Sequence, residues 1–134
     1  MSPELEALGM RAVACKGWRW MPGMLLHDIG TSRIGRVHKS GRDWVVFFGL
    51  TSEARLRRDT TGIGLSPDLN DPATLGCLLA LVREANSRPY ATAQYCGGYW
   101  QVEDPKDDRW DTDRGFGPWA TEAEALVAAL EAAP

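Results

Sequence analysis

The feature that most constrains the fold is a continuous apolar run, Trp44-Val45-Val46-Phe47-Phe48. A strand with one face in water alternates apolar and polar residues, so an unbroken run predicts a central strand covered on both faces. Just before it, Lys39-Ser40-Gly41-Arg42 is typical of a hairpin turn between the strands Arg33–His38 and Asp43–Gly49. This part of the chain therefore predicts an antiparallel sheet with the apolar strand in its interior.

Two segments carry the start and stop signals of amphipathic helices. Asp71-Pro72 combines a capping residue with proline at the first helical position, and Asn86-Ser87 ends the segment. Thr121-Glu-Ala-Glu124 is a capping box that begins a helix running to about Ala133. The apolar positions follow the helical spacing in both helices. They are Leu75, Leu78, Leu79 and Val82 in the first, and Ala123, Leu126, Val127 and Leu130 in the second.

The N-terminal segment predicts a shorter helix. Ser2-Pro3-Glu4 supplies a cap, a proline and an acidic residue in the first turn, and Gly9 is expected to stop the helix after about two turns. Arg11–Cys15 is short and mostly apolar, which favours a strand.

A second hairpin is predicted near the C-terminal end. Tyr90–Tyr95 and Tyr99–Glu103 have strand composition, and Cys96-Gly97-Gly98 between them is typical of a tight turn. Helices and strands follow one another without a regular βαβ rhythm, which favours the α+β class. We expect a single domain over residues 1–134, with a small, mainly antiparallel sheet packed with two amphipathic helices.

The net charge of −3 hides an asymmetry between the two halves of the chain. Residues 1–60 hold ten Lys and Arg against six Asp and Glu, whereas residues 61–134 hold five against twelve. The acidic charge is concentrated in residues 103–114, which we expect to form an exposed loop because so many carboxylates cannot be buried.

An exposed tryptophan ringed by charges is typical of an interface anchor. The acidic loop therefore predicts a partner-binding face that imitates an array of phosphates, with an aromatic anchor among the carboxylates. Its residues are Asp104, Asp107, Asp108, Trp110, Asp111 and Asp113.

The basic half leaves an alternative open, a nucleic-acid-binding module whose affinity falls steeply with salt. Its residues would be Arg33, Arg36, Lys39, Arg42, Arg55, Arg57 and Arg58. A further possibility is that the opposite charges of the two halves meet in the fold or face water.

No motif for catalysis or for a cofactor stands out. The three cysteines and two histidines lack the spacing of a zinc site, and none forms a recognisable set with a nucleophile and an acid. The acidic loop also lacks the pattern of a calcium-binding loop. We therefore expect no metal, no cofactor and no enzymatic activity, although an enzyme with an unannounced site remains an alternative.

The compartment is expected to be the cytoplasm. The first residues lack the basic and apolar regions of a signal peptide. No apolar run approaches the ~20 residues that a membrane-spanning helix needs.

Three stretches resemble segments of small uncharacterised proteins encoded by phages and prophages of proteobacteria. They are Cys15-Lys-Gly-Trp-Arg-Trp-Met-Pro-Gly-Met24, residues 67–85, and Ala120-Thr-Glu-Ala-Glu-Ala-Leu-Val-Ala-Ala-Leu130. The resemblance implies an accessory protein made inside a bacterial host. Small acidic phage proteins without catalytic motifs are often inhibitors of host defence, including anti-CRISPR proteins, so it also implies a host protein as partner, such as a nucleic-acid-binding defence complex.

Overall fold

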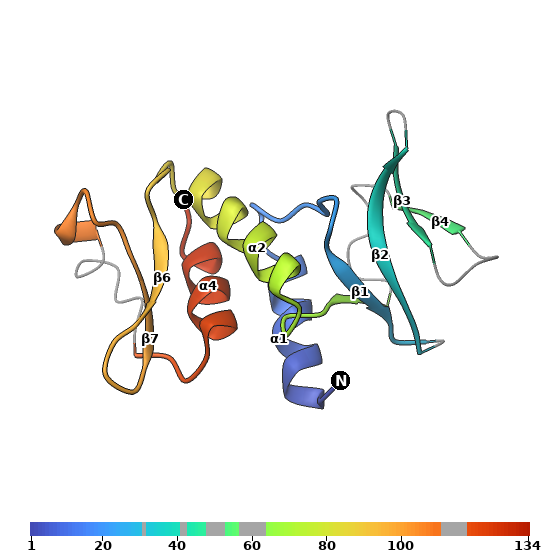
Figure 1. The fold of residues 1–134 in the computed structure, drawn as a ribbon, viewed down its shortest axis with the longest axis horizontal. Coiled ribbons are helices and arrows are strands. Elements are labelled where there is room, and N and C mark those ends of the chain that lie inside the picture. Colours follow the sequence, from blue (N-terminus) through green and yellow to red (C-terminus); the bar gives the residue numbers. More distant parts are fainter. Residues whose placement is uncertain (31, 41–42, 48–52, 57–63, 111–117) are drawn as a thin grey trace. The chain divides into compact units, whose positions relative to one another are not determined.

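The computed structural model describes residues 1–30, 32–40, 43–47, 53–56, 64–110 and 118–134. These residues form three long helices and seven strands, which confirms the α+β class (Figure 1). The elements in chain order are α1 (Pro3–Val13), β1 (Leu25–Asp28), β2 (Arg33–Ser40), β3 (Asp43–Phe47), β4 (Glu53–Leu56), β5 (Leu65–Pro67), α2 (Pro72–Ala85), β6 (Thr92–Tyr95), β7 (Trp100–Glu103) and α4 (Glu122–Glu131).

The chain divides into two compact units. The first contains Met1–Ala14 and Trp18–Cys77, and the second contains Cys15–Gly17 and Leu78–Pro134. Each unit is described by itself below, and a single domain over residues 1–134 stays a prediction.

The first unit is built on an antiparallel sheet with the strand order β4-β3-β2-β1-β5. The β2–β3 hairpin is confirmed, with Ser40 paired to Asp43, and the interior position of β3 between β2 and β4 is confirmed as well. The side chain of Val46 on β3 is completely buried. Strand β1 was not predicted, because its four residues are too few to show a period. The turn residues Gly41 and Arg42 lie outside the described part.

Helix α1 corrects two predictions. It continues through Gly9 to Val13, so the stop at Gly9 and the strand over Arg11–Cys15 are both wrong. The reason is a close approach to β5, because a Cβ on residue 9 would lie 3.0 Å from the carbonyl oxygen of Pro67 and closer still to Ser66 Oγ. Glycine is needed here for packing, and tertiary contacts outweigh its low helix propensity. The predicted start is confirmed, because Ser2 Oγ accepts the N–H of Leu5 at 3.2 Å.

Helix α2 begins and ends as predicted. Asp71 caps it by accepting the N–H of Thr74 at 3.0 Å, and Pro72 takes the first position. The left-handed backbone of Ser87, with a φ of 53°, follows the last turn. Leu78 and Val82 on its apolar face are completely buried.

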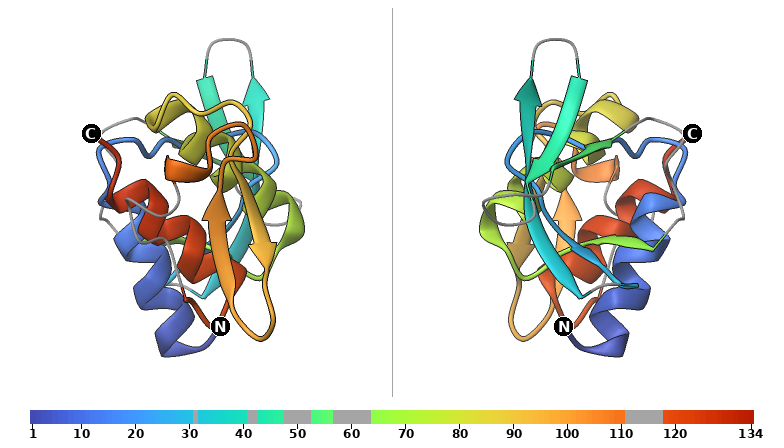
Figure 2. Two further views of the ribbon diagram at one scale, coloured as in Figure 1. Left: turned by 90° about the vertical axis from the view of Figure 1, so that its left-hand side faces the viewer. Right: turned by 90° about the vertical axis from the view of Figure 1, so that its right-hand side faces the viewer.

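The second unit contains residues 15–17, the later part of α2 from Leu78 onward, the β6–β7 hairpin and helix α4. Gly97 and Gly98 have φ values of 58° and 106°, and Cys96 N donates to Tyr99 O at 2.7 Å, as a two-residue type I′ turn requires. This confirms the predicted hairpin. Helix α4 packs on it (Figure 2), and its four predicted apolar residues are all buried. Thr121 caps α4 through the N–H of Glu124, as the capping box predicted.

Two tryptophans of the first unit are part of the core. Trp18 and Trp20 are buried and meet edge to face, with ring centroids 5.3 Å apart at 86°. Among the described helices, none combines the length and apolar character needed to cross a membrane.

Candidate functional site

The first unit contains an ion-pair network around Arg36 on β2. Arg36 donates to both carboxylate oxygens of Asp71, at 3.0 and 3.1 Å, and to the carbonyl oxygen of Gly23 at 2.6 Å. Thr74 Oγ1 donates to Asp71 Oδ2 at 2.9 Å and accepts the N–H of Leu25 at 2.8 Å. These bonds tie β1, β2 and the start of α2 together, which is a structural role.

The hydrogen bonds between Arg36 and Asp71 shift the pKa values of both groups. The hydrogen bond from Arg36, reinforced by Thr74, lowers the pKa of Asp71 to about 2. The same hydrogen bond raises the pKa of Arg36. The pair therefore stays charged at every physiological pH, and Arg36 stabilises the packing of β2 against the start of α2.

Of the other basic residues in the nucleic-acid-binding alternative, the structure describes the side chains of Arg33 and Lys39, and the alternative stays a prediction. Arg33 lies 3.4 Å from Asp28 in an exposed ion pair, and Lys39 is exposed on β2. Arg42, Arg57 and Arg58 lie outside the described residues, as does the side chain of Arg55.

One histidine–carboxylate pair lies beside a serine, the three residue types of a catalytic triad. His27 Nε2 lies 2.9 Å from Asp68 Oδ2, and Ser66 is the cross-strand neighbour of His27. However, Ser66 is completely buried, and its hydroxyl donates to the carbonyl oxygen of Glu6 at 3.3 Å. A catalytic serine needs an accessible oxygen that is hydrogen-bonded to the histidine. This arrangement therefore fits a structural role.

The cysteines offer no better nucleophile. None of the three forms a disulfide, and burial raises the pKa of the Cys77 thiol, which lowers its reactivity at neutral pH. Among the described residues, no group of three or more His, Cys, Asp and Glu side chains is placed to hold a metal ion.

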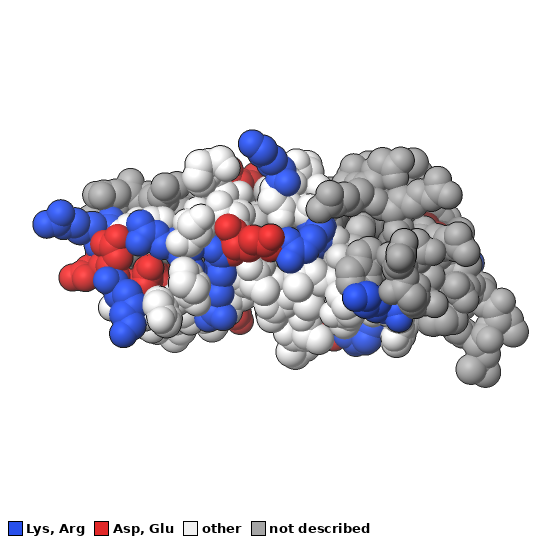
Figure 3. Space-filling model, turned by 90° about the horizontal axis from the view of Figure 1, so that it is seen from above, with Lys and Arg blue, Asp and Glu red and all other residues white. Residues whose placement is uncertain are grey.

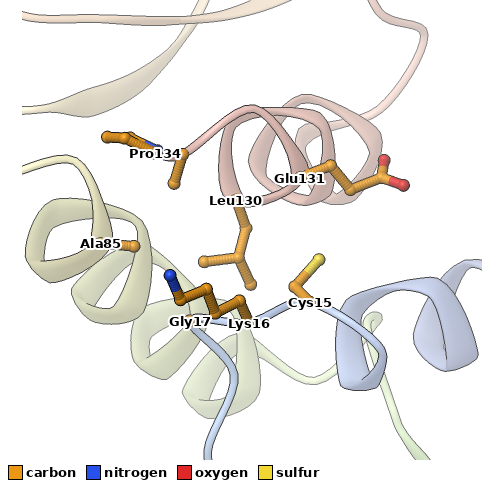
Figure 4. Close-up of a pocket in the computed structure, with 8 residues that line it drawn as sticks. Cys15, Lys16, Gly17, Ala85, Leu130, Glu131 and Pro134 are labelled. Carbon is orange, nitrogen blue, oxygen red and sulfur yellow. The ribbon is translucent and has the colours of Figure 1, made fainter.

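A small pocket opens in the second unit (Figure 4). Its volume is about 210 Å³, below the range typical of ligand sites. Leu130 points into it, whereas the carboxylate of Glu131 points away. The lining residues are Cys15, Lys16, Gly17, Ala85, Leu130, Glu131, Ala133 and Pro134. This lining is mostly apolar and presents no convergent set of polar groups.

The second unit has its own arginine centre, which orders the first part of the acidic segment. Arg88 Nη1 donates to Asp107 Oδ2 at 2.8 Å and lies 3.6 Å from Asp104 Oδ2. Its guanidinium lies 5.6 Å from the ring centroid of Trp110, within cation–π range. We call these four residues, Arg88, Asp104, Asp107 and Trp110, the Arg88 platform.

The platform contradicts the predicted exposure of Trp110 and Asp104, whereas the predicted role of the acidic segment in binding a partner stays a prediction. Trp110 is only 4% exposed, because the segment folds back and its ring packs against Arg88. Asp104 is also 4% exposed, because Arg88 neutralises it and the N–H of Lys106 donates to it at 2.8 Å. The hydrogen bond from Arg88 is the main cause that lowers the pKa of Asp107. Asp111 and Asp113 lie outside the described residues, and Asp108 is exposed.

The charge around the platform is mixed. Residues 103–110 contain four carboxylates and two basic side chains, and Arg88 adds a third cation. Figure 3 shows acidic and basic side chains next to one another on the visible face. The described part of the segment is therefore close to neutral and does not resemble a row of phosphates.

An exposed aromatic side chain does lie beside the platform, namely Tyr90. It is 57% exposed, and the ammonium group of Lys106 lies 5.4 Å from its ring centroid. Asp108 and Arg109 of the same segment are exposed as well. We call Tyr90, Lys106, Asp108 and Arg109 the Tyr90 surface.

The sequence analysis missed Tyr90 and Arg88, although a signal was present. The predicted hairpin pairs Thr92 with Glu103. Residues just before the first strand must then lie close to residues just after the second, which brings Arg88 near Asp104 and Asp107. A basic residue just before a predicted hairpin and acidic residues just after it therefore indicate that the segment is held by an ion pair.

Comparison with known proteins adds no relative from which a role can be transferred. No protein-family model, no curated protein and no solved structure matches the chain.

Proposed function

We propose that this protein is a non-enzymatic binding protein that attaches to another protein through the Tyr90 surface. The observation that carries the proposal is an exposed tyrosine beside an ordered, nearly neutral, charge-lined segment. Tyrosine is enriched at interfaces because it supplies a large contact area with few rotatable bonds.

The Arg88 platform supports this role through preorganisation. Binding costs conformational entropy whenever a loop has to become ordered in the complex. Arg88 already holds residues 104–110 by an ion pair of 2.8 Å and by its contact with the buried Trp110 ring. Lys106 is thereby positioned over Tyr90 before any partner arrives.

The kind of partner follows from the resemblance to prophage-encoded proteins. It favours a host protein, with inhibition of a nucleic-acid-binding defence complex as the consequence of binding. The mixed charge of the described segment favours recognition by aromatic contact and local ion pairs. Affinity should then depend weakly on salt, whereas imitation of phosphates would give a steep dependence.

The proposal is tested by capture from a bacterial host extract with the tagged full chain, before and after nuclease treatment. Tyr90→Ala is compared with Tyr99→Ala, a matched control because Tyr99 is also exposed but lies at the hairpin turn. We expect a nuclease-resistant protein that wild type and Tyr99→Ala retain, and whose affinity for Tyr90→Ala falls about tenfold or more.

Other outcomes would redirect the proposal. Equal capture by Tyr90→Ala and wild type would show that a different surface is used. A set of proteins that disappears with nuclease would favour the nucleic-acid-binding alternative.

A further inference from the structure

We infer that the outer edge of β6 binds the β6 edge of a second copy of this chain, which joins two hairpins into one antiparallel four-stranded sheet. The inference concerns Ala93, Gln94 and Tyr95 and does not depend on the Tyr90 surface.

The first step is the direction of the backbone groups. Trp100 exchanges two backbone hydrogen bonds with Trp119, at 2.7 and 3.0 Å, so its N–H and C=O point away from β6. Tyr95 is paired with Trp100, so its own N–H and C=O point away from β7, and those of Ala93 do the same two residues earlier. Among the described residues, no backbone hydrogen bond reaches these groups.

The second step is the lack of protection along β6 itself. The covering contact from Arg83 Nε, at 2.7 Å, reaches the carbonyl oxygen of Ala91, which precedes the strand. Natural edge strands are usually blunted by lysine, proline, a bulge or a covering segment. The sequence of β6 is Thr-Ala-Gln-Tyr, without charge or proline. By contrast, the outer edge of β7 is occupied by Trp119 at Trp100.

The third step is self-complementarity. A two-fold axis at Gln94 places Ala93 opposite Tyr95 of the second copy and Tyr95 opposite Ala93 of the second copy. The outward backbone groups then form two reciprocal hydrogen-bonded pairs. Tyr95 is 64% exposed, and the small Ala93 of the second copy leaves room for its ring. The two Gln94 side chains face each other, and amide groups can both donate and accept.

The fourth step is the size of the sheet. A two-stranded hairpin is marginal by itself and is stabilised by further strands or by packing against a helix. Helix α4 already packs on this hairpin, and a second hairpin would add further strands. The side chains of Ala93 and Tyr95 share a face with the buried Val102. Pairing at β6 would therefore double the sheet and extend that packed face.

The test uses the full chain in sedimentation equilibrium across a concentration series, with Gln94→Lys and the matched control Gln101→Lys. Gln101 is the direct neighbour of Gln94 on β7, so the two variants add the same charge to the same face. Only Gln94→Lys places two like charges across the two-fold axis. We expect a wild-type dimer, an unchanged Gln101→Lys dimer, and a dissociation constant raised about tenfold or more in Gln94→Lys.

A charge-swap experiment identifies the contact itself. Gln94→Glu alone should also weaken the dimer, and an equimolar mixture of Gln94→Lys and Gln94→Glu should restore it. A wild type that is monomeric throughout would overturn the inference. So would a Gln94→Lys dimer as tight as wild type, or equal weakening by Gln94→Lys and Gln101→Lys. None of these outcomes bears on capture of a partner through Tyr90.

Discussion

Each of the two units holds an arginine that binds aspartate, but the two ion pairs have different roles. One joins distant parts of the fold, and the other orders a single surface segment. Arg36 donates hydrogen bonds to both carboxylate oxygens of Asp71, whose side chain is only 13% exposed. Arg88 binds Asp107 through one guanidinium nitrogen, and the side chain of Asp107 is 38% exposed. The carboxylate is therefore more enclosed in the first unit than in the second, whereas the two arginines are similarly exposed, 40% for Arg36 and 31% for Arg88.

The surroundings of the two aspartates explain the difference. Asp71 also caps α2 and binds Thr74, which in turn binds β1, so its bonds join segments far apart in the sequence. Asp104, Asp107 and Trp110 all come from one short segment, so Arg88 orders that segment alone. Loss of the first network should weaken the fold, and loss of the second should loosen a surface.

The largest effect is expected for Asp71→Ala. It removes a helix cap and the carboxylate partner of Arg36, and should lower the free energy of unfolding by about 2 kcal/mol. Most of this loss should come from the cap, because Arg36 is 40% exposed and water screens its ion pair. Urea denaturation measures it, and Asp71→Asn, which keeps a good capping residue, should recover part of the loss. Equal effects of the two substitutions would show that capping contributes little.

A smaller loss, of about 1 kcal/mol, is expected for Arg88→Ala, which leaves the buried Asp104 without its cation. Proteolysis within residues 104–110 should accelerate more than the loss of stability alone explains, because the segment is released locally. Arg88→Lys restores the charge but not the planar contact with Trp110, and should behave in between. An Arg88→Ala protein with unchanged proteolysis would contradict the ordering role of the platform.

Acid titration sharpens the comparison further. Asp71 has a pKa of about 2 in the folded protein against a usual value of 3.8. The unfolded chain therefore binds more protons in this range, and stability is lost as the pH falls from about 4 toward 2. Unfolding followed by tryptophan fluorescence at several pH values should show this slope, and Asp71→Asn should flatten it. A slope unchanged in Asp71→Asn would assign the acid sensitivity to other carboxylates.

The smallest effect on stability is expected for Asp107→Asn, because this carboxylate is exposed and its ion pair is screened by water and salt. The change in melting temperature should be near the error of measurement and should vanish at high salt. A loss as large as that of Asp71→Asn would abolish the distinction between the two arginine centres.

Local signals in the sequence predicted the elements whose ends are set by neighbouring residues. The caps Ser2, Asp71 and Thr121 and the turn at Gly97-Gly98 were all readable, because each depends on a few residues close in the chain. The continuation of α1 through Gly9 was not, because its cause is β5, which lies more than fifty residues away.

The candidate site was harder to predict than the fold. Counting carboxylates in residues 103–114 correctly located an unusual segment but not its structure. Arg88, which lies outside the segment, forms ion pairs with Asp104 and Asp107 and contacts the ring of Trp110. A count of charges within residues 103–114 does not include it. Burial of a charged group depends on its partner, and partners are set by tertiary structure.

The path of the chain between the units has a consequence for how the protein is made. Residues 15–17 belong to the second unit, where a Cβ on Gly17 would lie 2.9 Å from Ala85 Cβ and 3.2 Å from Leu130 Cδ1. Residues 15–17 are synthesised early, but their contacts with α4 can form only after α4 itself has been synthesised. Neither unit is one uninterrupted piece of chain, so a truncation or a gene fusion at residue 77 would separate the second unit from part of its own packing.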